Sequence, residues 1–97
     1  MFDIFLTDTA GGQLRKLKSN KSLKKRYNAV TKSIHFLASN PRHPSLQTHE
    51  FTSLKGPNSE KVFEAYAEQK TPAAYRIFWC YGPKKKQITI IAITTHP

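Results

Sequence analysis

An arginine in the middle of an apolar stretch is the residue best suited to chemistry in this sequence. Arg76 lies inside the run Tyr75-Arg76-Ile77-Phe78-Trp79. A charge flanked by aromatic residues in a strand costs free energy unless it is paired or faces a cleft. One interpretation pairs Arg76 with a carboxylate such as Glu64 on a neighbouring strand. In the other, the guanidinium clamps a phosphate through two parallel hydrogen bonds, and the pattern favours neither.

Other titratable residues give weaker signals. His96 directly follows an apolar run, at an edge where a cleft would open. Its imidazole is suited to general acid or base catalysis, although a histidine near a chain end more often has no such role. Glu64 and Glu68 share one strand face, and such a pair is more often solvated than catalytic.

Strong motifs for cofactor or metal chemistry are absent from the sequence. It has no Walker loop and no glycine-rich dinucleotide fingerprint. The four histidines and the single cysteine lack the spacing of zinc ligands. We therefore expect no metal and no small-molecule cofactor, and we interpret Cys80 as a small core residue that forms no disulfide within the chain.

The charge is strongly positive and unevenly distributed. Sixteen Lys and Arg against six Asp and Glu give a formal net charge of +10, and no acidic residue lies between Asp8 and Glu50. A helix surface with only positive charges lacks the pairs of opposite charges that usually stabilise helices. This favours a polyanionic partner over a surface that serves only for solubility. The candidate nucleic-acid-binding residues are Arg15, Lys18, Lys21, Lys24, Lys25, Arg26, Lys32, Arg42, Lys84, Lys85 and Lys86.

Neither the start of the chain nor its longest apolar run indicates a membrane protein. The start, MFDIFLTD, has no basic leader, and the run over 88–93 is too short to cross a bilayer. We expect a soluble, cytoplasmic protein without a membrane partner.

The hydrophobic pattern predicts two helices after a short first strand. Phe2, Ile4 and Leu6 alternate with other residues, and Thr7 or Asp8 can cap the helix that follows. Two glycines at 11 and 12 predict that this helix is short or irregular.

The second helix has the clearest signal. Its apolar stripe is formed by Leu23, Tyr27, Val30, Ile34 and Leu37. Ser22 is the candidate N-cap, and Ser39-Asn40-Pro41 ends the helix because the residue before a proline avoids helical geometry.

From residue 49 onward the pattern changes to alternation. It predicts strands over 49–54, 62–68, 75–81 and 87–95, the last of them internal to the sheet because both of its faces are apolar. The order strand, two helices, four strands predicts an α+β fold, with the helices packed on one face of a mainly antiparallel sheet. At 97 residues, the chain is expected to form one domain over 1–97.

This order and three sequence stretches resemble the RelE/ParE superfamily of type II toxin–antitoxin toxins, the RelE-like mRNA interferase branch most of all. The stretches are Asn40-Pro41-Arg42-His43-Pro44-Ser45-Leu46, Tyr75-Arg76-Ile77-Phe78-Trp79, and Ile90-Ile91-Ala92-Ile93 followed by His96. With the element order, the likeness spans essentially the whole chain.

The resemblance implies a metal-independent endoribonuclease that cuts mRNA on the ribosome with the substrate's own 2′-hydroxyl as nucleophile. Arg76 matches the strand arginine that clamps the scissile phosphate, and His96 matches a late histidine that acts as acid or base. Glu64 and Tyr66 would assist proton transfer or stack on a base. The stretch Val62–Tyr66 lacks the two lysines of the best-known RelE sequences, although some nucleases of the family use a glutamate there.

The resemblance also implies partners and two alternatives. The partners are a cognate antitoxin, mRNA and ribosomal RNA, whose backbone the basic helices would contact. One alternative is a ParE-like protein that inhibits DNA gyrase by binding it without catalysis. The other is an RNA-binding protein of the toxin fold that does not cleave.

Overall fold

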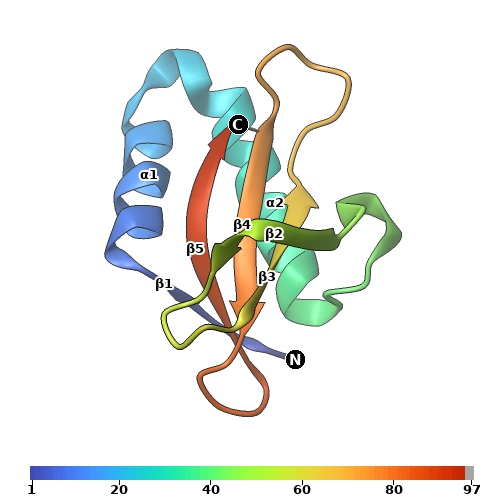
Figure 1. Cartoon of the computed structure of the whole chain (residues 1–97). Coiled ribbons are helices and arrows are strands. Elements are labelled where there is room, and N and C mark those ends of the chain that lie inside the picture. Colours follow the sequence, from blue (N-terminus) through green and yellow to red (C-terminus); the bar gives the residue numbers. More distant parts are fainter. Residues whose placement is uncertain (96–97) are drawn as a thin grey trace.

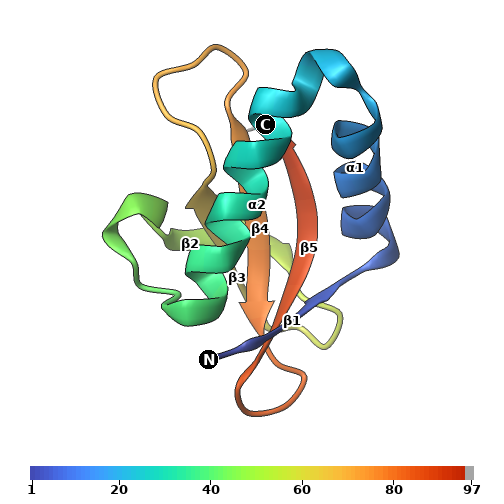
Figure 2. The ribbon, with the colours of Figure 1, turned by 180° about the vertical axis from the view of Figure 1, so that it is seen from behind.

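The computed structural model describes residues 1–95 and shows two helices on one face of a five-stranded sheet (Figures 1 and 2). The strands are β1 (Asp3–Leu6), β2 (His49–Lys55), β3 (Lys61–Tyr66), β4 (Tyr75–Tyr81) and β5 (Gln87–Thr95). The helices are α1 (Asp8–Ser19) and α2 (Lys24–Ser39), with short 3-10 turns η1 (Lys21–Leu23) and η2 (Pro44–Leu46). The predicted α+β fold and element order are confirmed.

The sheet has the strand order β1-β5-β4-β3-β2. β1 runs parallel to β5, with Ile4 opposite Ile88, and all other pairs are antiparallel. β5 therefore has a neighbour on each side, as its two apolar faces predicted. β2 is an edge strand, and in Figure 1 it crosses in front of β3 and β4, on the side away from the helices.

The first helix is longer and more regular than its glycines predicted. α1 runs unbroken over 12 residues, so the expectation of a short or irregular helix was wrong. Ala10 and Leu17 of this helix are buried in the core. The packing of this apolar face stabilises the helix by more than the low helix propensity of the two glycines destabilises it. Thr7 is the N-cap, because its hydroxyl accepts a hydrogen bond from the Ala10 amide at 3.1 Å.

The second helix follows its predicted stripe but begins differently. Val30 and Leu37 are fully buried, and α2 ends at Ser39 as expected. Ser22 does not cap it. Asn20 accepts hydrogen bonds from the Ser22 amide at 3.0 Å and from its hydroxyl at 2.7 Å, and this closes a 3-10 turn ahead of the helix.

One apolar core lies between the helices and the sheet. Its buried members come from both helices, η2 and the three inner strands; they are Ala10, Leu17, Val30, Leu37, Leu46, Ala65, Ile77, Trp79, Ile88, Ile90 and Ile93. The predicted alternation of β4 is confirmed, since Ile77 and Trp79 lie in this core while Arg76 and Phe78 point to the opposite face. None of the helices within residues 1–95 is long and apolar enough to span a membrane.

Candidate functional site

Three predicted site residues meet on the face of the sheet that the helices leave uncovered. Tyr66 and Arg76 are directly opposite each other in the β3–β4 ladder, so their side chains share a face. Glu64 lies two residues before Tyr66 and therefore points the same way. We call these residues, together with His49 described below, the Arg76 cluster.

Arg76 is held by several groups at once. Its guanidinium carbon lies 3.9 Å from the centroid of the Tyr66 ring. Its Nε lies 3.9 Å from Glu64 Oε2, and its Nη1 donates a hydrogen bond of 3.0 Å to the Glu68 carbonyl. Its side chain is 14% exposed. Arg76 is therefore paired with Glu64, as the first interpretation expected, and only a small part of its surface is open to a phosphate.

Glu64 is the centre of the cluster. Its side chain is 0% exposed, and its Oε1 lies 2.8 Å from Nε2 of His49. A buried carboxylate costs free energy unless polar or charged groups surround it, and His49 and Arg76 supply such groups here. Glu64 is therefore not solvated, although two carboxylates on one strand face more often are.

Glu68 has a structural position instead. Its side chain accepts a hydrogen bond from the Tyr75 amide at 3.1 Å and lies 3.7 Å from Nη1 of Arg26.

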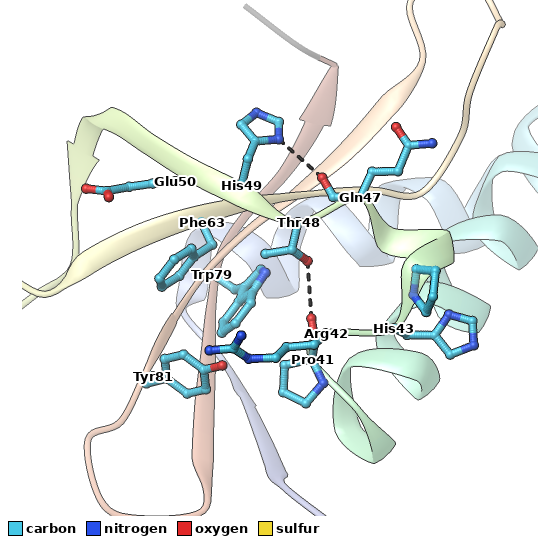
Figure 3. A pocket seen from close by; sticks show the side chains of 11 residues that line it. Pro41, Arg42, His43, Gln47, Thr48, His49, Glu50, Phe63, Trp79 and Tyr81 are labelled. Carbon is cyan, nitrogen blue, oxygen red and sulfur yellow. Dashed lines mark hydrogen bonds between the residues drawn. The ribbon is translucent and has the colours of Figure 1, made fainter.

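His49 is a site residue that the sequence pattern did not indicate. It comes from β2, and it is opposite Glu64 in the β2–β3 ladder. Its side chain is 47% exposed, its Nδ1 lies 3.2 Å from the Gln47 carbonyl (Figure 3), and its ring meets Tyr66 edge-on at 5.8 Å. Only the pairing of β2 with β3 brings it to Glu64, and the sequence pattern does not specify which strands are neighbours.

The two ring nitrogens of His49 have different surroundings. Nε2 faces the buried Glu64 carboxylate at 2.8 Å, and Nδ1 has the longer contact of 3.2 Å with a backbone carbonyl. A doubly protonated ring would donate to both acceptors. The carboxylate fixes the ring through Nε2, so Nδ1 is the nitrogen that could exchange a proton with a bound molecule once its contact with the Gln47 carbonyl opens.

His96, the predicted acid or base, lies outside the described residues. Within residues 1–95, no group of three or more His, Cys, Asp or Glu side chains is arranged to hold a metal ion. Cys80 is buried in the sheet, and burial, with a smaller effect of the Glu60 carboxylate, raises the pKa of its thiol. A thiol that stays protonated is a poor nucleophile, in agreement with its interpretation as a core residue.

The predicted nucleic-acid-binding residues do not form one patch. All are exposed except Arg26, whose Nη1 donates to the Ala73 carbonyl at 2.7 Å and whose guanidinium lies over the Tyr75 ring at 5.5 Å. Arg26 thus ties α2 to the β3–β4 connection. The lysines at 21, 24 and 25 lie where the helices join, and those at 84–86 lie in the β4–β5 loop at the other end of the sheet (Figure 1).

Comparisons with known proteins give structural matches only. No protein-family model and no curated protein sequence matches the chain. A YoeB/ParE toxin from Agrobacterium tumefaciens superposes with a TM-score of 0.72 at 10% identity, over 99% of this chain and 100% of that one. The YoeB dimer from Staphylococcus aureus gives a TM-score of 0.64 at 13% identity, covering 99% and 98% of the two chains.

An archaeal protein gives a third structural match of similar quality. RelE from the RelE–RelB complex of Pyrococcus horikoshii gives a TM-score of 0.64 at 15% identity, over 97% of this chain and 93% of that one. The likeness extends over the whole chain in each case, while the sequences have diverged. The chain therefore has the fold of the RelE/ParE toxins.

Proposed function

We propose that this protein is the toxin of a type II toxin–antitoxin pair and that it cleaves mRNA on the ribosome without a metal ion. The observation that supports this most strongly is the Arg76 cluster, in which a buried carboxylate lies between an arginine and a half-exposed histidine. Such a group can bind a phosphate and move a proton, and these are the tasks that RNA cleavage by its own 2′-hydroxyl requires.

Each member of the cluster has a distinct role in this proposal. The 2′-oxygen attacks the adjacent phosphorus and loses its proton, and the bond to the 5′-oxygen breaks to leave a cyclic phosphate and a new 5′-hydroxyl. The Arg76 guanidinium stabilises the charge that develops on the phosphate oxygens. His49 transfers a proton through Nδ1, and Glu64 is a positioning residue because it is wholly buried. Tyr66 holds the Arg76 guanidinium against its ring. His96 is proposed as the second proton-transfer group.

The proposed partners follow from the charge and the fold. Exposed lysines and arginines on α1, α2 and the β4–β5 loop would contact the backbones of mRNA and ribosomal RNA. A cognate antitoxin, acidic enough to bind a chain of net charge +10, would block these surfaces. The protein would act in the cytoplasm, where ribosomes translate.

A second candidate is a non-catalytic toxin that binds DNA gyrase. It is favoured by the 14% exposure of Arg76 and by the hydrogen bond that its Nη1 already makes to Glu68. An RNA-binding protein that does not cleave is a third candidate, compatible with the same basic surface.

Induced expression in bacteria with mapping of mRNA 5′ ends separates these candidates. We expect the wild type to arrest growth and to produce new 5′ ends inside translated codons. Arg76→Ala and His49→Gln should lose both effects, while Lys61→Ala, which removes an exposed charge outside the cluster, should retain them. Arrest without new 5′ ends would favour the gyrase-binding alternative.

A further inference from the structure

A cavity of about 510 Å³ lies toward the face of the sheet opposite the Arg76 cluster. It opens between β2, the ends of β3 and β4, and the loop that follows α2 (Figure 3). Its volume is in the range of pockets that bind small molecules, roughly 300–1,000 Å³. Of the cluster residues, only His49 reaches its edge, and none of the roles proposed above uses the cavity itself.

Three aromatic rings form one wall of the cavity. Trp79 lies at centroid distances of 5.0 Å from Phe63 and 4.9 Å from Tyr81. Tyr81 is 42% exposed, so it is the ring that a bound molecule would meet first. Trp79 is 1% exposed, and its indole N–H is buried without a hydrogen-bond partner among the described residues. A buried donor of this kind is costly unless a ligand satisfies it.

Two charged side chains also line the cavity. The exposed Arg42 side chain points toward Trp79 and Tyr81, whereas the Glu50 carboxylate points away from them (Figure 3). The backbone of this rim is fixed, because the Arg42 amide donates to Asn40 Oδ1 at 3.0 Å and the Thr48 hydroxyl donates to the Pro41 carbonyl at 3.2 Å. The site is therefore largely formed before a ligand arrives.

We propose that this cavity binds a guanine base of single-stranded RNA. Bases of single strands are recognised by stacking on aromatic rings and by hydrogen bonds to their edges. Guanine presents two acceptors, O6 and N7, that suit the two parallel donors of the Arg42 guanidinium. The choice of RNA as the ligand rests on the proposed function, whereas the choice of guanine rests on the residues of the cavity.

Trp79 is the one tryptophan of the chain, so the intrinsic tryptophan fluorescence of the protein is a probe of this cavity. Tryptophan fluorescence of the whole protein is titrated with guanosine, adenosine, cytidine and uridine, none of which carries a phosphate. We expect a saturable change with guanosine and a much weaker one with the other three nucleosides. Equal responses to all four, no saturable response, or displacement of guanosine by inorganic phosphate would overturn the proposal.

Variants test which side chains read the base. Arg42→Ala should weaken guanosine binding about tenfold, within the range that one bidentate base contact contributes. Lys61→Ala removes the same charge from an exposed position that does not line the cavity, and binding should be unchanged. Tyr81→Phe should bind as the wild type does, and Tyr81→Ser should bind more weakly. Equal binding by wild type and Arg42→Ala would contradict the assignment.

The guanosine-binding proposal and the proposed nuclease activity can be refuted separately. Arg76→Ala should lose mRNA cleavage and still bind guanosine, because Arg76 and the aromatic wall lie on opposite faces of the sheet. A protein that cuts mRNA but does not bind guanosine would refute this inference alone. A protein that binds guanosine but never cuts would refute the nuclease and retain the cavity as a base-binding site.

Discussion

At the scale of single residues, the position of Glu64 is the most informative feature of the molecule. Its carboxylate is fully buried, lies 2.8 Å from His49 and 3.9 Å from Arg76, and orients both. A buried ionic group of this kind is weak evidence for stability, because replacing the whole pair by apolar residues is often neutral. Its presence on a sheet face where the apolar Val62 and Phe78 are also buried is therefore better explained by a function that needs the charge.

Neutralising Glu64 should have separate effects on stability and on activity. We expect Glu64→Gln to lower the free energy of unfolding by about 1–3 kcal/mol, because an amide does not satisfy the partners that the carboxylate leaves behind. Urea unfolding measures this, with Glu50→Gln on the exposed part of β2 as the matched control. RNA cleavage should fall far more than the loss of folded protein explains. A Glu64→Gln variant with full activity would contradict the positioning role.

Cys80 should be chemically inert in the folded protein. Burial, and to a lesser extent the charge of Glu60, raises the pKa of its thiol, so the reactive thiolate is scarce near neutral pH. Alkylation by iodoacetamide, followed by mass spectrometry, should be slow in buffer and fast in denaturant. Rapid modification of the native protein would contradict the core assignment.

At the scale of elements, strand alternation is readable from the sequence, whereas strand pairing is not. Alternation predicted that Glu64 and Tyr66 share one face of their strand and suggested Glu64 as a partner of Arg76, and the β3–β4 register agrees with both. His49 was missed because its contact depends on β2 pairing with β3, and a pattern within one strand does not specify its neighbour. The parallel pairing of β1 with β5 was not predicted for the same reason.

The cap of α1 is a second feature for which local signals were sufficient. The Thr7 hydroxyl accepts from the Ala10 amide and donates to the Ile91 carbonyl at 2.9 Å, so it joins the helix start to β5. Thr7→Ala should lower the free energy of unfolding by about 1–2 kcal/mol, a loss typical of an N-cap. Thermal or urea unfolding checks this, and the exposed Thr9→Ala on the same helix should change little. Equal stability of Thr7→Ala and wild type would contradict the cap.

At the scale of the whole molecule, positive charge is spread over two ends of the sheet. One group lies where α1 meets α2, and the other lies in the β4–β5 loop, while the Arg76 cluster lies on the sheet face that the helices leave uncovered (Figure 1). Two separated basic groups suit a long polyanion that crosses the molecule better than a compact anion. The net charge of +10 also makes association sensitive to salt.

Salt dependence should therefore identify the residues that contact the RNA backbone. The affinity for single-stranded RNA should fall as salt rises, and the slope on logarithmic axes should shrink by about 0.7 for each phosphate contact removed. Lys24→Ala combined with Lys25→Ala should lower the slope, whereas Lys55→Ala combined with Lys61→Ala should not. An unchanged slope in the first double variant would exclude the α2 start from the RNA surface.

The central claim is that the Arg76 cluster cuts mRNA on the ribosome, and cleavage by purified components tests it most directly. Wild-type protein, Arg76→Ala and His49→Gln are each mixed with ribosomes programmed with a defined mRNA, and the 5′ ends are mapped by primer extension. We predict cuts at a codon in the ribosome for the wild type and at least a hundredfold slower cleavage by both variants, consistent with the roughly 10²-fold or larger contributions of such groups. Intact mRNA with the wild type, or equal cleavage by all three proteins, would contradict the claim.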